Sequence, residues 1–230
     1  MDYLIVSGCS FTSSTWRDLP DKTHVIAWPD YLRDKFFPNA KLLNFADNGV
    51  GNDYIFYSLI HGLKSIEPGS KIMCIAAWTG NCRESWLTED GNIGLKSNYD
   101  TRPFSSLWIH DNFTHDNQKG KVPYYTKNQK FNAQRINLYR YALGKFCDDL
   151  DVTLHDFNML EAEYPLGIDC PYELLINPKQ LLFKTHDWIF KIVPELENEE
   201  FMSSDNFHPN TAGQKLIAER VYNELQRLGY

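Results

Sequence analysis

A serine stands directly after the first apolar run of the chain, at a place where a nucleophile could work. Residues 3–6 read Tyr-Leu-Ile-Val, which predicts a short buried strand, and Gly8, Cys9 and Ser10 follow it. At the carboxyl end of a strand and near the start of a helix, unpaired N–H groups would stabilise the oxyanion that a serine creates when it attacks a carbonyl. The alternative interpretation is that Ser10 only caps that helix. The context is neither a G-x-S-x-G turn nor a phosphate-binding loop, because Thr12 replaces the second glycine and no Gly-Lys-Ser/Thr follows.

A carboxylate and an imidazole stand three residues apart near the end of the chain. Residues 205–210 read Asp-Asn-Phe-His-Pro-Asn, and a tight turn there would let Asp205 bind one ring nitrogen of His208. The other nitrogen would then be free to act as a base. Asn210 or Thr211 could cap the helix that follows. An incidental histidine in a capping turn is the alternative, and zinc is a weaker option because no third ligand has suitable spacing.

Two further turns offer hydrogen-bond donors. The second predicted strand ends just before Gly49, and the third ends near Trp78 and is followed by Asn81 and Arg83. A glycine N–H can approach a substrate without obstruction by a side chain, and an Asn amide can donate to an oxyanion. Arg83 could pair with an anionic substrate group and Trp78 could wall a pocket, whereas a surface ion pair and a core ring are the alternatives. Each turn alone also fits an ordinary connection between a strand and a helix.

The elements that must position these residues alternate along the chain. Apolar runs predict strands at 3–6, 41–45, 71–77 and 152–157. Helical spacing predicts helices at about 28–37, 54–66, 132–149, 178–192 and 211–228. This alternation favours a parallel sheet covered on both faces, with its site beyond the carboxyl ends of the strands. Residues 86–130 lack a sustained period, which predicts long loops with a hairpin as an option, and we expect substrate specificity to reside there.

Composition excludes several classes of protein. The 230 residues suit a single globular domain, and the net charge of -7 without a basic run argues against binding of nucleic acid. Five cysteines, an odd number without a C-x-x-C pair, indicate reduced thiols rather than disulfides or a metal site. The chain shows no signal peptide and no apolar run near the ~20 residues of a membrane span, so we expect a cytoplasmic protein. Aromatic residues make up 14% of the chain; besides Trp78, the rings beside the motifs or in the long loops are those of Phe11, Phe207, Trp86 and Trp108.

The first and last of these motifs resemble the SGNH (GDSL-type) hydrolase superfamily. Gly8-Cys9-Ser10 resembles its Gly-Asp-Ser block, with Cys9 in place of Asp. The sequence from Asp205 to Asn210 closely matches its D-x-x-H-P block, and Trp28-Pro29 is similar to the Trp-Pro helix of many members.

The middle blocks are less regular. The stretch from Asn44 to Gly49 is similar to the second block, with Gly51 where a Ser or Thr is common. Gly80-Asn81 resembles the Gly-x-Asn-Asp block, with Cys82 replacing the Asp. The resemblance spans about residues 3–225 apart from 86–130, and the surroundings of Asn81 resemble divergent members, some of them carried by phages.

The resemblance implies a three-layer α/β/α sandwich with a short, parallel, flavodoxin-like sheet of four or five strands, and it implies hydrolysis of esters. It assigns a triad of Ser10, His208 and Asp205, with an oxyanion hole from the N–H groups of Ser10 and Gly49 and the side chain of Asn81. The expected substrate is a small-molecule or carbohydrate ester, such as an O-acetyl sugar, with Trp78, Arg83, Phe11 and Phe207 as candidate binding residues. No cofactor and no metal are expected.

Three other functions stay open at this stage. A binding or structural module that has lost catalysis would explain the departures at Cys9, Gly51 and Cys82. The intact Ser10, Asp205 and His208 argue against it. An O-acyltransferase could use the same triad. A Cys9 nucleophile is a remote option.

Overall fold

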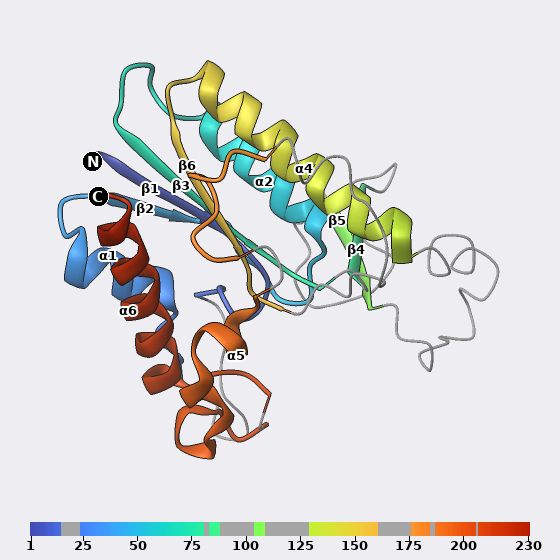
Figure 1. Cartoon of the computed structure of the whole chain (residues 1–230), viewed down its shortest axis with the longest axis vertical. Helices are drawn as coiled ribbons and strands as arrows, with labels where there is room; N and C mark the ends of the chain where they lie inside the picture. The colour runs from blue at the N-terminus through green and yellow to red at the C-terminus, as the bar shows by residue number, and fades with distance from the viewer. Residues whose placement is uncertain are drawn as a thin grey trace.

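The structure of the protein is a computed structural model that describes residues 1–14, 24–80, 83–87, 104–108, 129–160, 176–184, 187–205 and 207–230 (Figure 1). In the segments 83–87, 104–108 and 129–133 the description concerns the backbone.

Four parallel strands form one sheet in the order β2-β1-β3-β6. The strands are β1 (Tyr3–Ser7), β2 (Lys41–Asn44), β3 (Ile72–Trp78) and β6 (Thr153–Asn158). After their first residues, β1 and β3 are buried throughout, which explains why both read as unbroken apolar runs. Each crossover between these strands carries a helix, so the order is the flavodoxin-like doubly wound arrangement.

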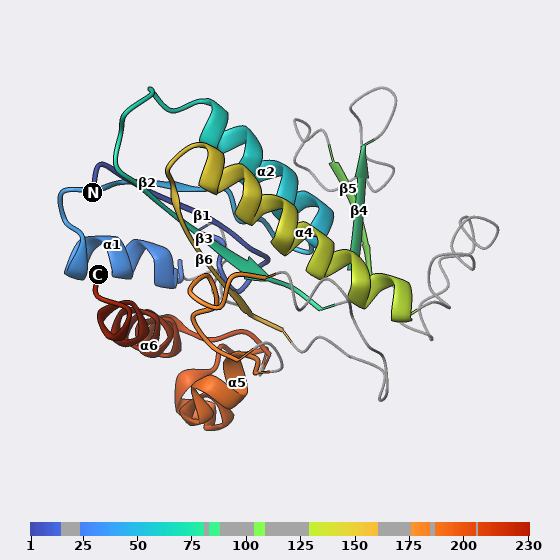
Figure 2. The same ribbon diagram turned by 45° about the horizontal axis from the view of Figure 1, so that its top comes forward.

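The helices cover both faces of the sheet and complete a three-layer sandwich. One face carries α1 (Trp28–Phe36) and α6 (Thr211–Arg227), and the other carries α2 (Asn52–Lys64) and α4 (Gln129–Asp149) (Figure 2). Stacked rings join each pair of helices: Phe36 and Tyr222 lie 3.8 Å apart between centroids, and Phe56 and Tyr139 lie 4.9 Å apart. The predicted fold class is therefore confirmed.

A separate two-stranded hairpin follows β3. Its antiparallel strands, β4 (Arg83–Leu87) and β5 (Phe104–Trp108), pair Arg83 with Trp108, and β4 lies beside α2. The predicted loop insertion at 86–130 thus contains a hairpin that begins slightly earlier than expected, and α4 begins before the insertion ends. The rest of that stretch lies outside the described residues.

The helix predicted over 178–192 is wrong for most of its length. The main chain around Leu181 instead runs along β6: Asp156 N–H donates to Gln180 O at 2.8 Å, and Leu182 N–H donates to Asp156 O at 3.0 Å. Among the residues of this segment that the structure describes, helix appears only at α5 (Ile189–Ile192). It stops before Pro194 because a proline disfavours helical geometry in the residue before it. Two short 3₁₀ turns, η3 (Pro194–Glu197) and η4 (Glu199–Phe201), lead on toward α6.

The core lies between the sheet and its helices. Cys9, Cys74 and Cys147 are buried there as free thiols. Across the described ranges, no helix combines the length and apolar character that crossing a membrane requires.

Candidate active site

Ser10 lies in a tight turn directly beyond β1, at the carboxyl edge of the sheet. Thr12 N–H donates to Cys9 O at 2.8 Å and closes the turn. Gly8 is needed for this close packing, because a Cβ there would lie 2.5 Å from Thr12 Oγ1. Ser10 is 4% exposed whereas Cys9 is fully buried, so the turn presents the hydroxyl rather than the thiol. Residues 15–23, which follow this turn, lie outside the described residues, and the next described helix along the chain is α1.

Three neighbouring elements hold this turn in place. Asn44, the last residue of β2, donates from Nδ2 to Thr12 O at 2.9 Å, and Trp28 at the start of α1 donates from Nε1 to Thr12 Oγ1 at 3.3 Å. Gln214 of α6 is buried, and its amide bridges two elements. Its Nε2 donates to Phe11 O at 3.1 Å, and its Oε1 accepts from Trp28 N–H at 2.9 Å. The helix that follows His208 is thereby tied to the residue that follows Ser10.

The Asp205–His208 pair sits in a loop closed by its own hydrogen bonds. Asp205 Oδ1 accepts from the N–H groups of Phe207 and His208, both at 2.9 Å, and Asp205 Oδ2 lies 2.6 Å from His208 Nδ1. Ser203 N–H donates to His208 O at 2.7 Å. Asn210 caps α6 as expected, since its Oδ1 accepts from two N–H groups of the first turn. The loop therefore holds the imidazole in one orientation.

The two ends of the chain meet at this imidazole. His208 Nε2 lies 2.8 Å from Ser10 Oγ, a contact between residues 198 positions apart. Burial opposes the charge on Asp205, but the hydrogen bonds from the His208 main chain and ring and from Phe207 outweigh it and lower the pKa of this carboxyl. A carboxylate only accepts hydrogen bonds. His208 Nδ1 therefore carries the ring proton, and Nε2 is left to accept from the serine hydroxyl.

Gly49 lies in the turn after β2, beside the Ser10 turn. Its φ is +73°, in the left-handed region that glycine enters without steric cost. Asp47 N–H donates to Gly8 O at 3.1 Å, which joins the turn after β2 to the residues just before Ser10. The structure thus brings the neighbourhoods of Gly49 and Ser10 together at one edge of the sheet.

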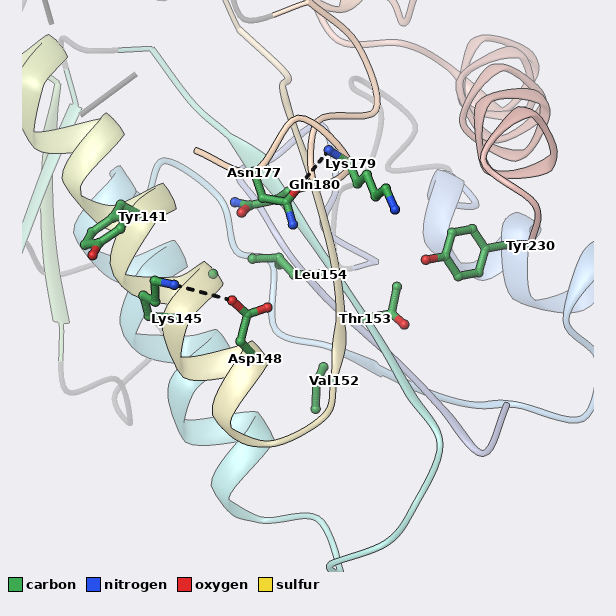
Figure 3. Close-up of a pocket in the computed structure, with 11 residues that line it drawn as sticks. Tyr141, Lys145, Asp148, Val152, Thr153, Leu154, Asn177, Lys179, Gln180 and Tyr230 are labelled. Atoms are coloured by element: carbon green, nitrogen blue, oxygen red, sulfur yellow. Dashed lines mark hydrogen bonds and ion pairs between the residues drawn. The ribbon is translucent and has the colours of Figure 1, made fainter. Parts of the chain in front are cut away.

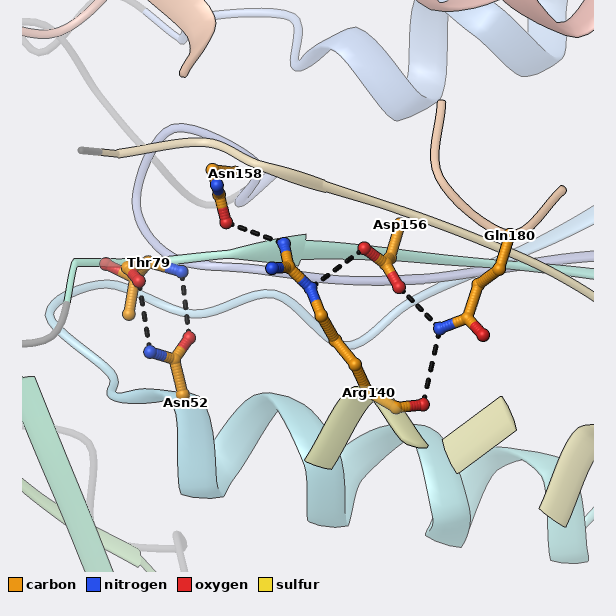
Figure 4. A network of polar contacts seen from close by, with 6 residues as sticks. All are labelled: Asn52, Thr79, Arg140, Asp156, Asn158 and Gln180. Carbon is orange, nitrogen blue, oxygen red and sulfur yellow. Dashed lines mark hydrogen bonds and ion pairs between the residues drawn. The ribbon is translucent and has the colours of Figure 1, made fainter. Parts of the chain in front are cut away.

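The turn after β3 is fastened to the start of α2. Asn52 Nδ2 donates to Thr79 O at 3.0 Å, and Thr79 N–H donates to Asn52 Oδ1 at 2.9 Å (Figure 4). Both residues are buried. Asn81, the predicted third oxyanion donor, lies two residues further on and outside the described residues.

The structure describes the side chain of Trp78 but only the backbone of Arg83, another candidate for contact with the substrate. The Trp78 side chain is fully buried, with the Arg140 guanidinium 6.0 Å from its ring centroid, so the alternative of a core ring describes it better than a pocket wall. Arg140 itself is a buried cation that lies 3.0 Å from Asp156 Oδ1 and donates to Asn158 Oδ1 at 2.6 Å (Figure 4). Arg83 lies on β4, where the description concerns the backbone.

Aromatic rings surround His208. Phe11 is fully buried and lies 4.9 Å from the imidazole between ring centroids, so it supports the His208 ring from the core side. Phe207 is 46% exposed and lies 5.1 Å from the imidazole. Phe190, 6.3 Å from Phe11, and Trp188, 5.0 Å from Phe190, extend the cluster. These last two were not predicted, because they sit where the sequence indicated an ordinary helix.

A pocket of about 210 Å³ lies elsewhere, between α4, the start of β6 and Tyr230 (Figure 3). Its walls include Lys145, Asp148 and Thr153. Because Thr153 begins β6 and Ser10 follows the end of β1, the pocket and the serine lie at opposite ends of the parallel strands. The pocket does not belong to the site described above.

No protein-family model and no curated protein matches the sequence. Solved structures do match over nearly the whole chain, and the matches with TM-scores of 0.50 or more establish its fold. The structure of TesA is 13% identical, with a TM-score of 0.51, and the match covers 99% of each chain.

LAE5, an alpha/beta hydrolase enzyme from the metagenome of Lake Arreo in Spain, is 12% identical with a TM-score of 0.50, over 100% of this chain and 97% of LAE5. A lipolytic protein of the G-D-S-L family from Veillonella parvula is 11% identical with a TM-score of 0.46, over 99% and 100% of the two chains. At these identities the matches to TesA and LAE5 establish the fold alone, and the three-layer α/β fold that the resemblance implies is thus confirmed.

Proposed function

We propose that the protein is a serine hydrolase of the SGNH type that cleaves esters through an acyl-enzyme on Ser10. The observation that carries this proposal is the continuous line of contacts from Asp205 through His208 to Ser10, at 2.6 and 2.8 Å. Nucleophile, base and orienting carboxylate in this order are what an activated serine requires. The match of the whole chain to hydrolase folds is consistent with this proposal.

In the proposed reaction, His208 Nε2 takes the proton from Ser10 Oγ as the oxygen attacks the acyl carbonyl. The oxyanion that forms accepts hydrogen bonds from the N–H groups of Ser10 and Gly49 and from the Asn81 amide. The intermediate collapses when His208 delivers the same proton to the departing alcohol oxygen. Ser10 then carries the acyl group.

Water completes the cycle by the reverse sequence of proton transfers. His208 removes a proton from the water, which attacks the acyl carbonyl, and it returns that proton to Ser10 Oγ when the acid leaves. Asp205 stays ionised throughout, consistent with its lowered pKa, and stabilises the imidazolium that forms twice in each turnover.

The proposed substrate is a small ester, such as an O-acetyl group on a carbohydrate. Phe207 is exposed beside the base and is the predicted binding residue best placed to contact it. Arg83 remains a proposed partner for an anionic substrate group. We also propose a cytoplasmic location, which the free thiols of Cys74 and Cys147 support.

Labelling with a fluorophosphonate tests the nucleophile. Attack by Ser10 Oγ forms the P–O bond, fluoride leaves, and the serine proton passes to His208. One adduct per chain is expected, on the peptide that contains Ser10. We expect Ser10→Ala to abolish labelling and turnover of p-nitrophenyl acetate, and His208→Ala to lower the turnover number at least 10³-fold.

Ser58→Ala is the matched control, because Ser58 is also buried and hydrogen-bonded but lies in the middle of α2. It should label like the wild type. Labelling of Ser10→Ala at the wild-type rate would contradict the proposed nucleophile, and an unlabelled wild type would favour a non-catalytic module. Acylated alcohol as the main product when an alcohol acceptor is present would make the protein an acyltransferase instead.

A further inference from the structure

Phe207 is an exposed apolar ring placed directly beside the proposed base. The described part of the chain exposes six large apolar side chains by 40% or more: Ile26, Tyr57, Leu138, Leu150, Phe207 and Tyr230. Among these six, Phe207 is the one whose ring contacts a residue of the proposed triad, with centroids 5.1 Å apart and the planes at 80°. What distinguishes Phe207 is therefore its position, because its exposed apolar surface lies next to the imidazole that would transfer protons in the proposed reaction.

Contacts of its main chain and its side chain fix the position of Phe207. The Phe207 N–H donates to Asp205 Oδ1, the same oxygen that accepts from His208 N–H. One edge of the ring packs on Phe11, with centroids 5.6 Å apart and an angle of 86° between planes. Because Phe11 is fully buried, its own position is fixed and it supports the Phe207 ring. The exposed face of Phe207 is therefore a preformed surface that loses little entropy when it binds a ligand.

The chemistry of the site decides which half of an ester would reach this surface. The imidazole gives its proton to the oxygen of the departing alcohol, so that oxygen must lie within hydrogen-bond reach of His208 Nε2. The carbonyl oxygen lies instead toward the N–H groups of Ser10 and Gly49, at the ends of β1 and β2. A group attached to the alcohol oxygen is therefore the part of the substrate that comes nearest to Phe207.

We propose, on the basis of the proposed esterase function, that Phe207 binds the alcohol half of the substrate. The substrate class is an ester whose alcohol carries a flat apolar face, either an aryl group or the C–H face of a sugar ring. Ring-to-ring contact of this kind contributes modestly, so the expected effect on kcat/KM is about tenfold.

The test compares Phe207→Ala and Phe207→Leu with the wild type on two series of esters. The first keeps the acetyl group and varies the alcohol: methyl, phenyl and 2-naphthyl acetate. The second keeps p-nitrophenol and varies the acyl chain: acetate, butyrate and hexanoate. We expect Phe207→Ala to lower kcat/KM about tenfold for naphthyl acetate and no more than twofold for methyl acetate. In the acyl series the loss should be the same for every chain length.

Hydrolysis of the acetyl-enzyme provides a readout that a general structural defect would change. The acetyl-enzyme is the same species for every acetate and no longer contains the alcohol, so its hydrolysis rate should be unaltered in both variants. Phe207→Leu keeps an apolar side chain over Phe11 and serves if the alanine variant does not fold. Tyr57→Ala is the matched control, because Tyr57 is 51% exposed but lies on α2, and it should behave like the wild type.

Equal losses on methyl, phenyl and naphthyl acetate would overturn the inference, as would losses that follow the acyl chain or slower hydrolysis of the acetyl-enzyme. A 6-O-acetyl hexoside distinguishes the two ligand sources. A tenfold loss there as well supports stacking on a sugar ring, and a loss confined to aryl esters supports an aryl alcohol. A wild type without labelling at Ser10 would overturn the proposed function itself, which is a different result from a wild type that acylates but ignores Phe207.

Discussion

Replacing Arg140 by methionine should destabilise the protein strongly and in a way that depends on pH. Arg140 is fully buried on α4, 3.0 Å from Asp156 Oδ1. Methionine keeps an unbranched side chain and the helix propensity of arginine, but it is shorter and carries no charge. Asp156, also fully buried, would then keep Gln180 Nε2 at 2.5 Å as a donor and lose its cation.

The size of the effect follows from the burial of the carboxylate. Removing one partner of a buried ion pair typically costs about 3–5 kcal/mol, because the remaining charge is left in an apolar interior. This is a large share of the roughly 5–15 kcal/mol by which a domain is stable. Burial already raises the pKa of Asp156, with Arg140 and the hydrogen bonds opposing it. Without Arg140 that pKa should rise further.

The sign of the pH dependence follows from that shift. A carboxyl whose pKa is higher in the folded than in the unfolded state favours folding at low pH, where both states are protonated. The benefit is lost as the pH rises from the unfolded pKa toward the folded one. Arg140→Met should therefore be only mildly destabilised near pH 4, and the deficit relative to the wild type should grow toward pH 8.

Urea unfolding followed by tryptophan fluorescence at pH 4, 6 and 8 measures this free energy. The double variant Arg140→Met/Asp156→Asn removes both charges and leaves an amide oxygen for Gln180, so it should recover to within about 2 kcal/mol of the wild type. A deficit below about 1 kcal/mol at pH 8, a deficit independent of pH, or a double variant no more stable than the single one would refute the reasoning.

Two further predictions concern Gln214 and His155. Gln214→Leu should leave Phe11 O and Trp28 N–H buried without these partners, which should lower the free energy of unfolding by roughly 1–3 kcal/mol for each group. It should also displace the Ser10 turn and thereby slow phosphonate labelling of Ser10 at least tenfold. A wild-type labelling rate in the destabilised variant would show that other contacts hold the turn. Burial lowers the pKa of His155 to about 4, and the hydrogen bonds to the main chain of Gln180 and Lys179 oppose this shift only in part. Between about pH 6.5 and pH 4 the histidine is therefore protonated in the unfolded chain but neutral in the folded one, so the stability of the fold decreases as the pH falls through this range. His155→Phe should flatten the dependence of Tm on pH over this range, and parallel curves for the two proteins would contradict it.

The regular part of the fold could be predicted because local pattern and tertiary role agree there. The strands β1 and β3 are buried on both faces, so their apolar runs identify them without knowledge of their partners. The helix predicted over 178–192 is wrong because the conformation of this segment depends on a strand that is distant in the sequence. Nothing in the sequence near Gln180 indicates that the main chain there pairs with Asp156. The polar and apolar residues of this segment are spaced as in a helix, so the pattern alone predicts one.

The proposed triad could be predicted for a similar reason. Ser10, Asp205 and His208 are small polar groups directly beside an element boundary, where their types and spacing carry a chemical meaning. The sequence does not indicate which residues hold these three side chains in place. Asn52, Arg140 and Gln214 look like ordinary polar positions on amphipathic helices, and only the three-dimensional arrangement shows that all three are buried against the carboxyl edge of the sheet or the Ser10 turn.

The separation of Ser10 and His208 along the chain has a consequence for folding. Closing a loop of 198 residues is a slow and late event compared with pairing neighbouring strands. A nascent chain that has reached residue 200 already contains the proposed nucleophile but lacks the proposed base, so its serine has the low reactivity of a free alcohol. In the proposed mechanism, covalent chemistry becomes available only when α6 docks and Gln214 reaches the Ser10 turn. Labelling of Ser10 during refolding would therefore report the completion of the native structure rather than its onset.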